Sequence, residues 1–115
     1  MATELVVGVG YVSLLFRHAQ SLKDKRQVLR SLSQKLKNSG FSVTECGYAD
    51  DIKRGELGFT FAGHGIRYVQ EQLDSAMFLF AGDYHVVTSK KDVFRYDELV
   101  KDDEFIAFTE GTEDS

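Results

Sequence analysis

The 115-residue chain contains no proline, no tryptophan and one cysteine. A single thiol cannot form an internal disulfide or a zinc-binding cysteine cluster, so we expect Cys46 to be a buried, unreactive thiol. No apolar run approaches the roughly 18 residues of a membrane-spanning helix. The first residues lack the basic segment and cleavage site of a secretory signal. These absences predict a cytoplasmic protein.

The residue patterns of common enzyme classes are also missing. The three histidines, at positions 18, 64 and 85, form no i,i+4 pair and have no cysteine partner, so no metal site is predicted. Gly8 and Gly10 lack the third glycine of a dinucleotide-binding turn, and no helix follows them directly. The sequence therefore predicts a protein that is not an enzyme and has no cofactor.

What the chain does contain is enough apolar material for one domain. Hydrophobic residues make up 43% and aromatic residues 12% of the sequence, a composition typical of a globular core. Residues 1–96 carry 13 Lys and Arg against 10 Asp and Glu, whereas residues 97–115 carry one Lys against eight acids. We therefore expect a single, mildly basic domain over 1–96 and an acidic tail over 97–115. The tail is predicted to be solvated, or to fold back over a basic surface.

Hydrophobic periodicity predicts four strands and two helices. The expected strands are 5–16, 41–49, 56–62 and a last one from about 84, continuing to 94 after a bend at 89–92. The expected helices are 21–37 and about 64–81. The order β-α-β-β-α-β predicts an α+β ferredoxin-like fold, a four-stranded antiparallel sheet with both helices on one face.

The helix predicted over 21–37 has two distinct sides. Ser21 is a good N-cap, with Asp24 at the capping-box position, and 38–40 provide the stop. At about 100° per residue, one broad arc is mostly apolar. It contains Leu22, Lys25, Val28, Leu29, Leu32 and Leu36. Beside it lies a narrow row of cations, which we call the basic strip: Lys23, Arg26, Arg30 and Lys37.

The same segment carries a family resemblance. Residues 21–32, Ser-Leu-Lys-Asp-Lys-Arg-Gln-Val-Leu-Arg-Ser-Leu, resemble the S-L-K-[ED]-K-R-x-V-[VL]-x-S-L motif of the small bacterial YlxP-like proteins. The strand at 6–9, the segment 43–47 and the pair 57–58 are similar to that family at the same spacing. Ile52 departs from it, since the family commonly has tryptophan there. The resemblance implies a ferredoxin-like, bacterial, cytoplasmic protein of unknown function, encoded among translation genes, with no known catalytic residues.

Lys25 and Glu45 form a predicted structural ion pair. Lys25 lies within the apolar arc of the first helix, and Glu45 shares a strand face with Phe41 and Val43. Both side chains should therefore point into the helix–sheet interface at the same edge of the sheet. The alternative is that Lys25 extends out to solvent from the first helical turn.

The basic strip is the predicted nucleic-acid-binding surface. Lys23, Arg26, Arg30 and Lys37 are spaced to follow phosphates, although a row of four cations is also typical of a solvated helix. The predicted partner is a ribosomal subunit or its RNA, with no membrane partner. Leu57, Phe59 and Phe61 are expected to form the core rather than a base-stacking platform.

An alternative function is assembly or small-ligand binding without nucleic acid. Val7, Val9 and Tyr11 would leave an apolar patch on the outer face of the sheet. A second copy of the chain, forming a homodimer, or the tail segment 105–108 could cover that patch.

Overall fold

The computed structural model describes residues 4–99. The chain forms β1 (Leu5–Leu15), α1 (Leu22–Asn38), β2 (Ser42–Gly47), β3 (Arg54–His64), α2 (Ile66–Met77), β4 (His85–Arg95) and the short α3 (Tyr96–Leu99). Of the predicted acidic tail, residues 100–115 lie outside the described part, and so does the segment 105–108. Within residues 4–99, no helix is long and apolar enough to cross a membrane.

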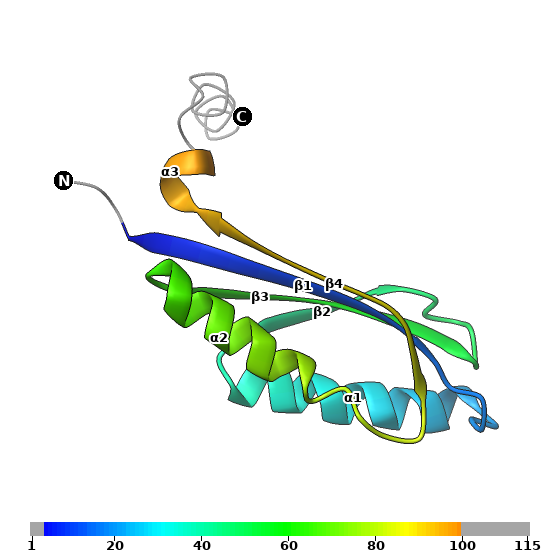
Figure 1. The fold of residues 1–115 in the computed structure, drawn as a ribbon. Coiled ribbons are helices and arrows are strands. Elements are labelled where there is room, and N and C mark those ends of the chain that lie inside the picture. The colour runs from blue at the N-terminus through cyan, green and yellow to red at the C-terminus, as the bar shows by residue number, and fades with distance from the viewer. Residues whose placement is uncertain (1–3, 100–115) are drawn as a thin grey trace, which may run out of the picture.

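The four strands form one antiparallel sheet in the order β2-β3-β1-β4. Both long helices lie on the same face of that sheet, as Figure 1 shows. α1 packs mainly on β2 and β3, whereas α2 covers β1, β3 and β4. Neither α1 nor α2 covers the opposite face of the sheet, which we call the open face. The predicted α+β ferredoxin-like fold is confirmed.

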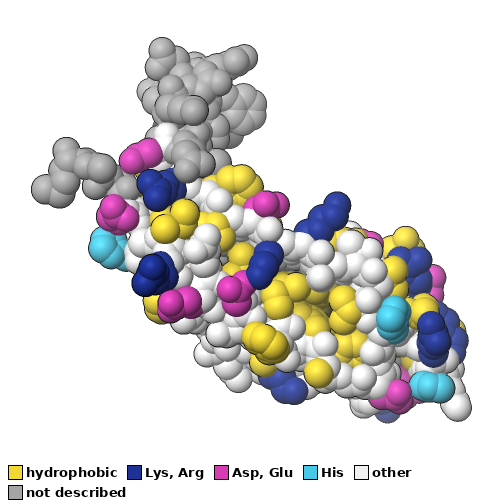
Figure 2. Space-filling model, in the orientation of Figure 1, with side chains coloured by type: hydrophobic (Ala, Val, Ile, Leu, Met, Phe, Trp, Pro, Cys, Tyr) yellow, Lys and Arg dark blue, Asp and Glu magenta, His cyan; other side chains and the backbone are white. Residues whose placement is uncertain are grey.

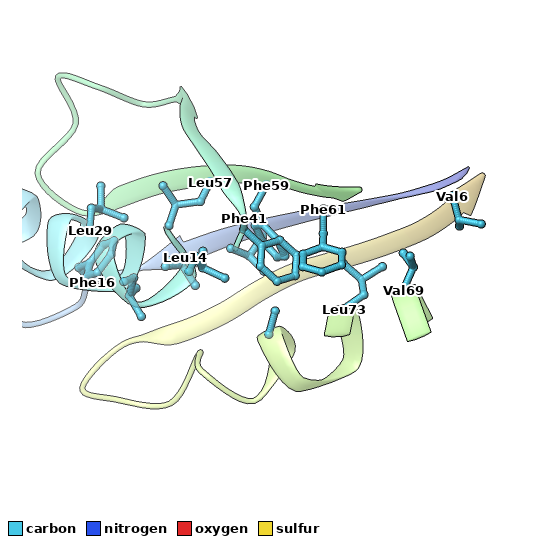
Figure 3. Close-up of a cluster of buried hydrophobic side chains, with 14 residues drawn as sticks. Val6, Leu14, Phe16, Leu29, Phe41, Leu57, Phe59, Phe61, Val69 and Leu73 are labelled. Atoms are coloured by element: carbon cyan, nitrogen blue, oxygen red, sulfur yellow. The ribbon is translucent and has the colours of Figure 1, made fainter. Parts of the chain in front are cut away.

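The core lies between the sheet and the two helices. The rings of Phe41, Phe59 and Phe61 gather at its centre, and Figure 3 shows them beneath the sheet. The Phe41 ring centroid is 5.6 Å from that of Phe59 and 5.1 Å from that of Phe61. Leu73 of α2 seals one end of this cluster, and Leu29 of α1 lies toward the other. The alternation predicted for β3 is therefore confirmed.

Two glycines of β1 make room for the core. A Cβ at Gly10 would lie 2.2 Å from the Phe59 ring, and one at Gly8 would lie 2.9 Å from the side chain of Val69 in α2. Gly8 permits the close approach of a helix that the sequence predicts. Gly10 instead leaves space for an aromatic ring from the neighbouring strand.

The bounds of several elements differ from the prediction. β3 is longer and α2 is shorter than expected. No bend interrupts β4 at 89–92, where its register with β1 is continuous. The irregularity comes earlier, because the register shifts between Ser13 and Leu14 of β1 and leaves Val87 without a partner. Polar residues at 89–92 suggested a turn, but pairing with the long central strand β1 keeps this segment extended.

Candidate functional site

α1 begins and ends as its sequence predicts. The Ser21 hydroxyl accepts a hydrogen bond from the backbone N–H of Asp24, and the Asp24 carboxylate accepts one from the backbone N–H of Gln20. These bonds satisfy N–H groups that have no partner within the helix. At the other end, Gly40 adopts a φ of +92°, which glycine takes without strain. The helix is therefore fixed at both ends.

The basic strip lies on the solvent side of α1. Lys23, Arg26, Arg30 and Lys37 are all exposed, while Leu29, Leu32 and Leu36 on the other side are buried. Between residues 4 and 99, the only ion pair joins Lys91 to Asp74. None of the four cations donates a side-chain hydrogen bond to a described residue. The strip spans 15 residues, from Lys23 to Lys37, or about 21 Å along the helix axis.

A shallow hollow of about 480 Å³ lies on α1 beside the strip. Arg30 and Lys35 supply cations to its lining, and Gln27 and Gln34 supply side-chain amides. Amides donate and accept hydrogen bonds, whereas cations contact phosphates. The hollow therefore combines the two kinds of group that contact a nucleotide.

Lys25 is fully buried, with no exposed surface. Its ammonium donates to carbonyl oxygens of the β2–β3 loop and of the first residue of β3: Tyr48 at 2.6 Å, Arg54 at 2.9 Å, Ala49 at 3.4 Å and Asp51. We call these four oxygens the carbonyl cage. An ammonium has three protons, so the long contact to Ala49 is the weakest of the four.

The predicted ion pair between Lys25 and Glu45 is wrong. Glu45 is exposed on the edge strand β2, and Lys25 is held by backbone oxygens instead. The alternative, that Lys25 extends to solvent, is wrong as well. The apolar arc correctly placed Lys25 inside the interface. The sequence did not reveal its partners, because every residue has a carbonyl group and only the path of the loop brings four together.

Further hydrogen bonds order the β2–β3 loop and tie it to the segment that leads into α1. The Asp51 carboxylate accepts hydrogen bonds from the backbone N–H groups of Lys53 and Arg54. The Lys53 ammonium donates to the carbonyl oxygens of Arg17 and Ala19, at 2.9 and 2.6 Å. The loop and the segment leading into α1 therefore form one hydrogen-bonded unit.

The open face carries a polar pair that the sequence analysis did not identify. The Tyr11 hydroxyl of β1 donates a 2.6 Å hydrogen bond to the Glu56 carboxylate of β3. That bond, together with burial, raises the pKa of the Tyr11 phenol. Gly47 leaves room for the carboxylate, since a Cβ there would lie 2.3 Å from a Glu56 oxygen. Cross-strand neighbours on one face are hard to predict before the register is known.

Cys46 lies next to this pair and is exposed, so its predicted burial is wrong. β2 is an edge strand, and its register shifts between Glu45 and Gly47, which leaves Cys46 unpaired at the irregularity. Partial burial of the thiol raises its pKa, and the nearby Glu56 carboxylate raises it further. A raised pKa favours the protonated thiol, which is a weaker nucleophile than the thiolate.

Arg54 sits at the end of the open face nearest the carbonyl cage. Its guanidinium donates to the Ser13 hydroxyl at 3.2 Å and lies 4.5 Å from the centre of the Tyr48 ring. Its buried Nε has no hydrogen-bond partner among the described residues. The stacked ring orients the guanidinium, and Arg54 holds the end of β3 against β1.

The predicted apolar patch of Val7, Val9 and Tyr11 lies on the open face. Val9 is 36% exposed, whereas Val7 and Tyr11 are half-buried. A hollow of about 320 Å³ lies beside Val9 and is lined by Thr44 and Gly58, among others. The Tyr11 end of the patch carries the polar Tyr11–Glu56 pair.

The described residues contain no cluster of three or more His, Cys, Asp or Glu side chains able to hold a metal ion. All three histidines are exposed.

Comparison with known proteins places the chain in a family. No curated protein matches it significantly. Among solved structures, a candidate antibiotic biosynthesis monooxygenase from Bacillus cereus is similar over 86% of this chain and 95% of its own, with 11% identity and a TM-score of 0.40. Residues 7–91 match the family described as "Protein of unknown function (DUF503)". The chain belongs to this DUF503 family of proteins of unknown function.

Proposed function

We propose that this protein is a binding protein, not an enzyme, and that it contacts RNA, on a ribosomal subunit or a precursor of one, through the basic strip of α1. One observation carries the proposal: the four cations lie exposed along one helix, and none has an ion-pair partner within residues 4–99. Uncompensated cations in a row are suited to phosphates along a nucleic-acid backbone. The hollow beside Arg30 adds amides for the sugar or base.

The resemblance of residues 21–32 to YlxP-like proteins supports the same partner. Members of that family are bacterial and are encoded among translation genes. The resemblance also implies a cytoplasmic location. Binding through four phosphate contacts would be tolerant of sequence and sensitive to salt. With a slope of about −0.7 per contact for single-stranded RNA, affinity should fall roughly 50-fold between 50 and 200 mM salt.

The test is charge reversal at the middle of the strip. The variant R26E/R30E should abolish most binding to RNA or ribosomal subunits at low salt, and the remaining salt slope should be about half or less. The matched control is R67E/R95E, which makes the same charge change at exposed positions away from α1. Binding is measured by co-sedimentation with subunits and by fluorescence anisotropy with labelled RNA.

Equal weakening by both variants would mean that only the overall charge matters, and unchanged binding by R26E/R30E would overturn the proposal.

The alternative function is protein–protein or small-ligand binding at the open face. The exposed Val9 and the hollow beside it favour that alternative. It predicts that Val9→Asp changes assembly or ligand binding, whereas R26E/R30E does not.

A further inference from the structure

The outer edge of β4 is a long strand edge without a partner among the described residues. β4 pairs with β1 on one side only, and the pairing runs without a break from Thr88 to Arg95. No hydrogen bond beyond that ladder involves the β4 backbone within residues 4–99. The other edge, β2, has six residues and an irregular register. β4 is therefore the better template for another strand.

The charges on β4 are arranged by face. Lys90 and Asp92 lie opposite Tyr11 and Val9 of β1, so both are on the open face. Lys91 is on the helix face, where its ammonium pairs with the Asp74 carboxylate of α2. Lysines on an edge strand usually prevent unwanted pairing. Here one of the two lysines is already neutralised, and the other has an acid two residues away.

We propose that two copies of this protein pair through β4, antiparallel and about a two-fold axis at Lys91, to form a continuous eight-stranded sheet. A two-fold axis perpendicular to the sheet keeps every side chain on its own face of the sheet. Each residue therefore lies opposite a residue of the partner whose side chain is on the same face, and the axis passes at a residue position, not between two residues. With the axis at Lys91, Lys90 lies opposite the partner's Asp92, and Asp92 lies opposite the partner's Lys90. Two ion pairs form on the open face.

The neighbouring registers lack this complementarity. An axis at Lys90 places that lysine opposite the partner's Lys90, and an axis at Asp92 places two carboxylates opposite each other. Like charges directly opposite each other in a sheet are destabilising. With the axis at Lys91, the two facing ammonium groups are each compensated by Asp74 of their own chain. Charge complementarity therefore selects one register.

The flank of α2 beside β4 supports the same arrangement. A hollow of about 480 Å³ lies there, lined by Gln70 and Asp74 of α2 and by Lys91 and Val93 of β4. Phe78 lies one helical turn beyond Asp74 on the same side of α2 and is 86% exposed. Figure 2 shows acidic, basic and apolar side chains side by side on the face formed by α2 and β4. In the proposed dimer, each α2 presents this flank to the axis.

Pairing about this axis keeps α1 and α2 of both copies on the same side of the joint sheet. α2 lies near β4 and α1 lies over β2 and β3. The two basic strips would therefore lie toward opposite ends of one surface. This follows from the strand order and does not depend on what the strips bind.

A charge-swap experiment on the full chain tests the register. Sedimentation equilibrium should show a dimer for the wild type. K90D and D92K should each raise the dimer dissociation constant by about tenfold or more, because like charges replace two ion pairs. The double variant K90D/D92K restores opposite charges and should recover the dimer. Thr60→Asp is the control, because Thr60 is exposed on the open face of β3 and does not pair with β4, and it should leave the dimer intact.

A wild type that is monomeric at about 100 μM would overturn the proposal. Dissociation by Thr60→Asp alone would also overturn it, because that result would place the contact on the open face. A double variant whose dimer is no tighter than that of D92K would overturn it as well.

Disulfide trapping provides an independent readout. In a C46S background, Lys91→Cys places two thiols opposite each other at the axis, at a Cα separation of about 4.5–5.5 Å that a disulfide can span. Ser89→Cys is the matched control, because its partner position lies four residues away. Mild oxidation should cross-link Lys91→Cys at least tenfold faster than Ser89→Cys. Equal rates for the two variants would contradict the register.

Discussion

Replacing Lys25 by methionine removes the ammonium from the carbonyl cage while keeping a similar chain length. We expect this to be among the most destabilising single substitutions in the protein. Lys25 is fully buried, and its three protons are directed at backbone oxygens of Tyr48, Ala49, Asp51 and Arg54. The substitution leaves these oxygens without the donor that brings them together.

The expected loss in free energy of unfolding depends on how many hydrogen bonds are removed and on how far water can replace them. A hydrogen bond from a charged donor contributes about 1.5–3 kcal/mol, so three would contribute about 5–9 kcal/mol before the cost of burying the ammonium. That cost is several kcal/mol, and the loop residues are largely exposed, so water can replace part of what is lost. A loss of about 3–4 kcal/mol remains, in line with breaking a buried ionic contact.

Urea unfolding followed by circular dichroism measures this loss, and thermal unfolding should show a midpoint lower by about 12–25 °C. Glu45→Ala is the matched control, because Glu45 is the sequence-predicted partner of Lys25 but is exposed. It should change the free energy of unfolding by less than about 0.5 kcal/mol. Lys25→Arg should also destabilise, because a planar guanidinium cannot direct its donors at four converging oxygens.

A loss below about 1 kcal/mol for Lys25→Met would show that the carbonyl cage does not stabilise the fold. A large loss of stability for Glu45→Ala would instead support the sequence-predicted ion pair between Lys25 and Glu45, which the structure does not contain.

Two further predictions concern the sheet. The Glu56 hydrogen bond raises the pKa of the Tyr11 phenol, so the folded state favours the neutral phenol. The stability that this bond contributes is fully present below the ordinary phenol pKa. It is lost as the pH rises through the raised pKa of the folded state. Glu56→Gln should lower the phenol pKa, measured as the absorbance titration that disappears in Tyr11→Phe; an unchanged titration would exclude the hydrogen bond as the cause. Gly10→Ala should cost about 1–3 kcal/mol in urea unfolding, because its Cβ would lie 2.2 Å from the Phe59 ring. A stability equal to the wild type would mean that the ring moves freely.

The elements whose pattern is local were predicted correctly. The N-cap at Ser21, the buried arc of α1 and the core face of β3 all follow from side-chain spacing along one segment. The placement of Lys25 within the interface belongs to the same class. Each of these features is set by which side of a single helix or strand a residue occupies.

The predictions that were wrong concern features that depend on contacts between segments. Glu45 has the parity of a buried residue, but β2 is an edge strand and α1 does not cover that side chain. Cys46 was placed in the core by composition, whereas a register shift in β2 exposes it. The Tyr11–Glu56 pair joins residues 45 positions apart and becomes visible only once β1 and β3 are aligned.

The carbonyl cage and the basic strip use one short segment in opposite directions. In Ser21-Leu-Lys-Asp-Lys-Arg, Ser21 and Asp24 cap the helix, Lys25 points inward to the loop, and Lys23 and Arg26 point outward. Because Lys25 fixes the first turn of α1 to the β2–β3 loop, the outward cations start from a rigid backbone and lose less conformational freedom on meeting a phosphate. The Lys25→Met variant should therefore weaken RNA binding, although it leaves the charge of the basic strip unchanged. In this protein, the stability of the loop and the first two cations of the proposed binding surface depend on the same helical turn.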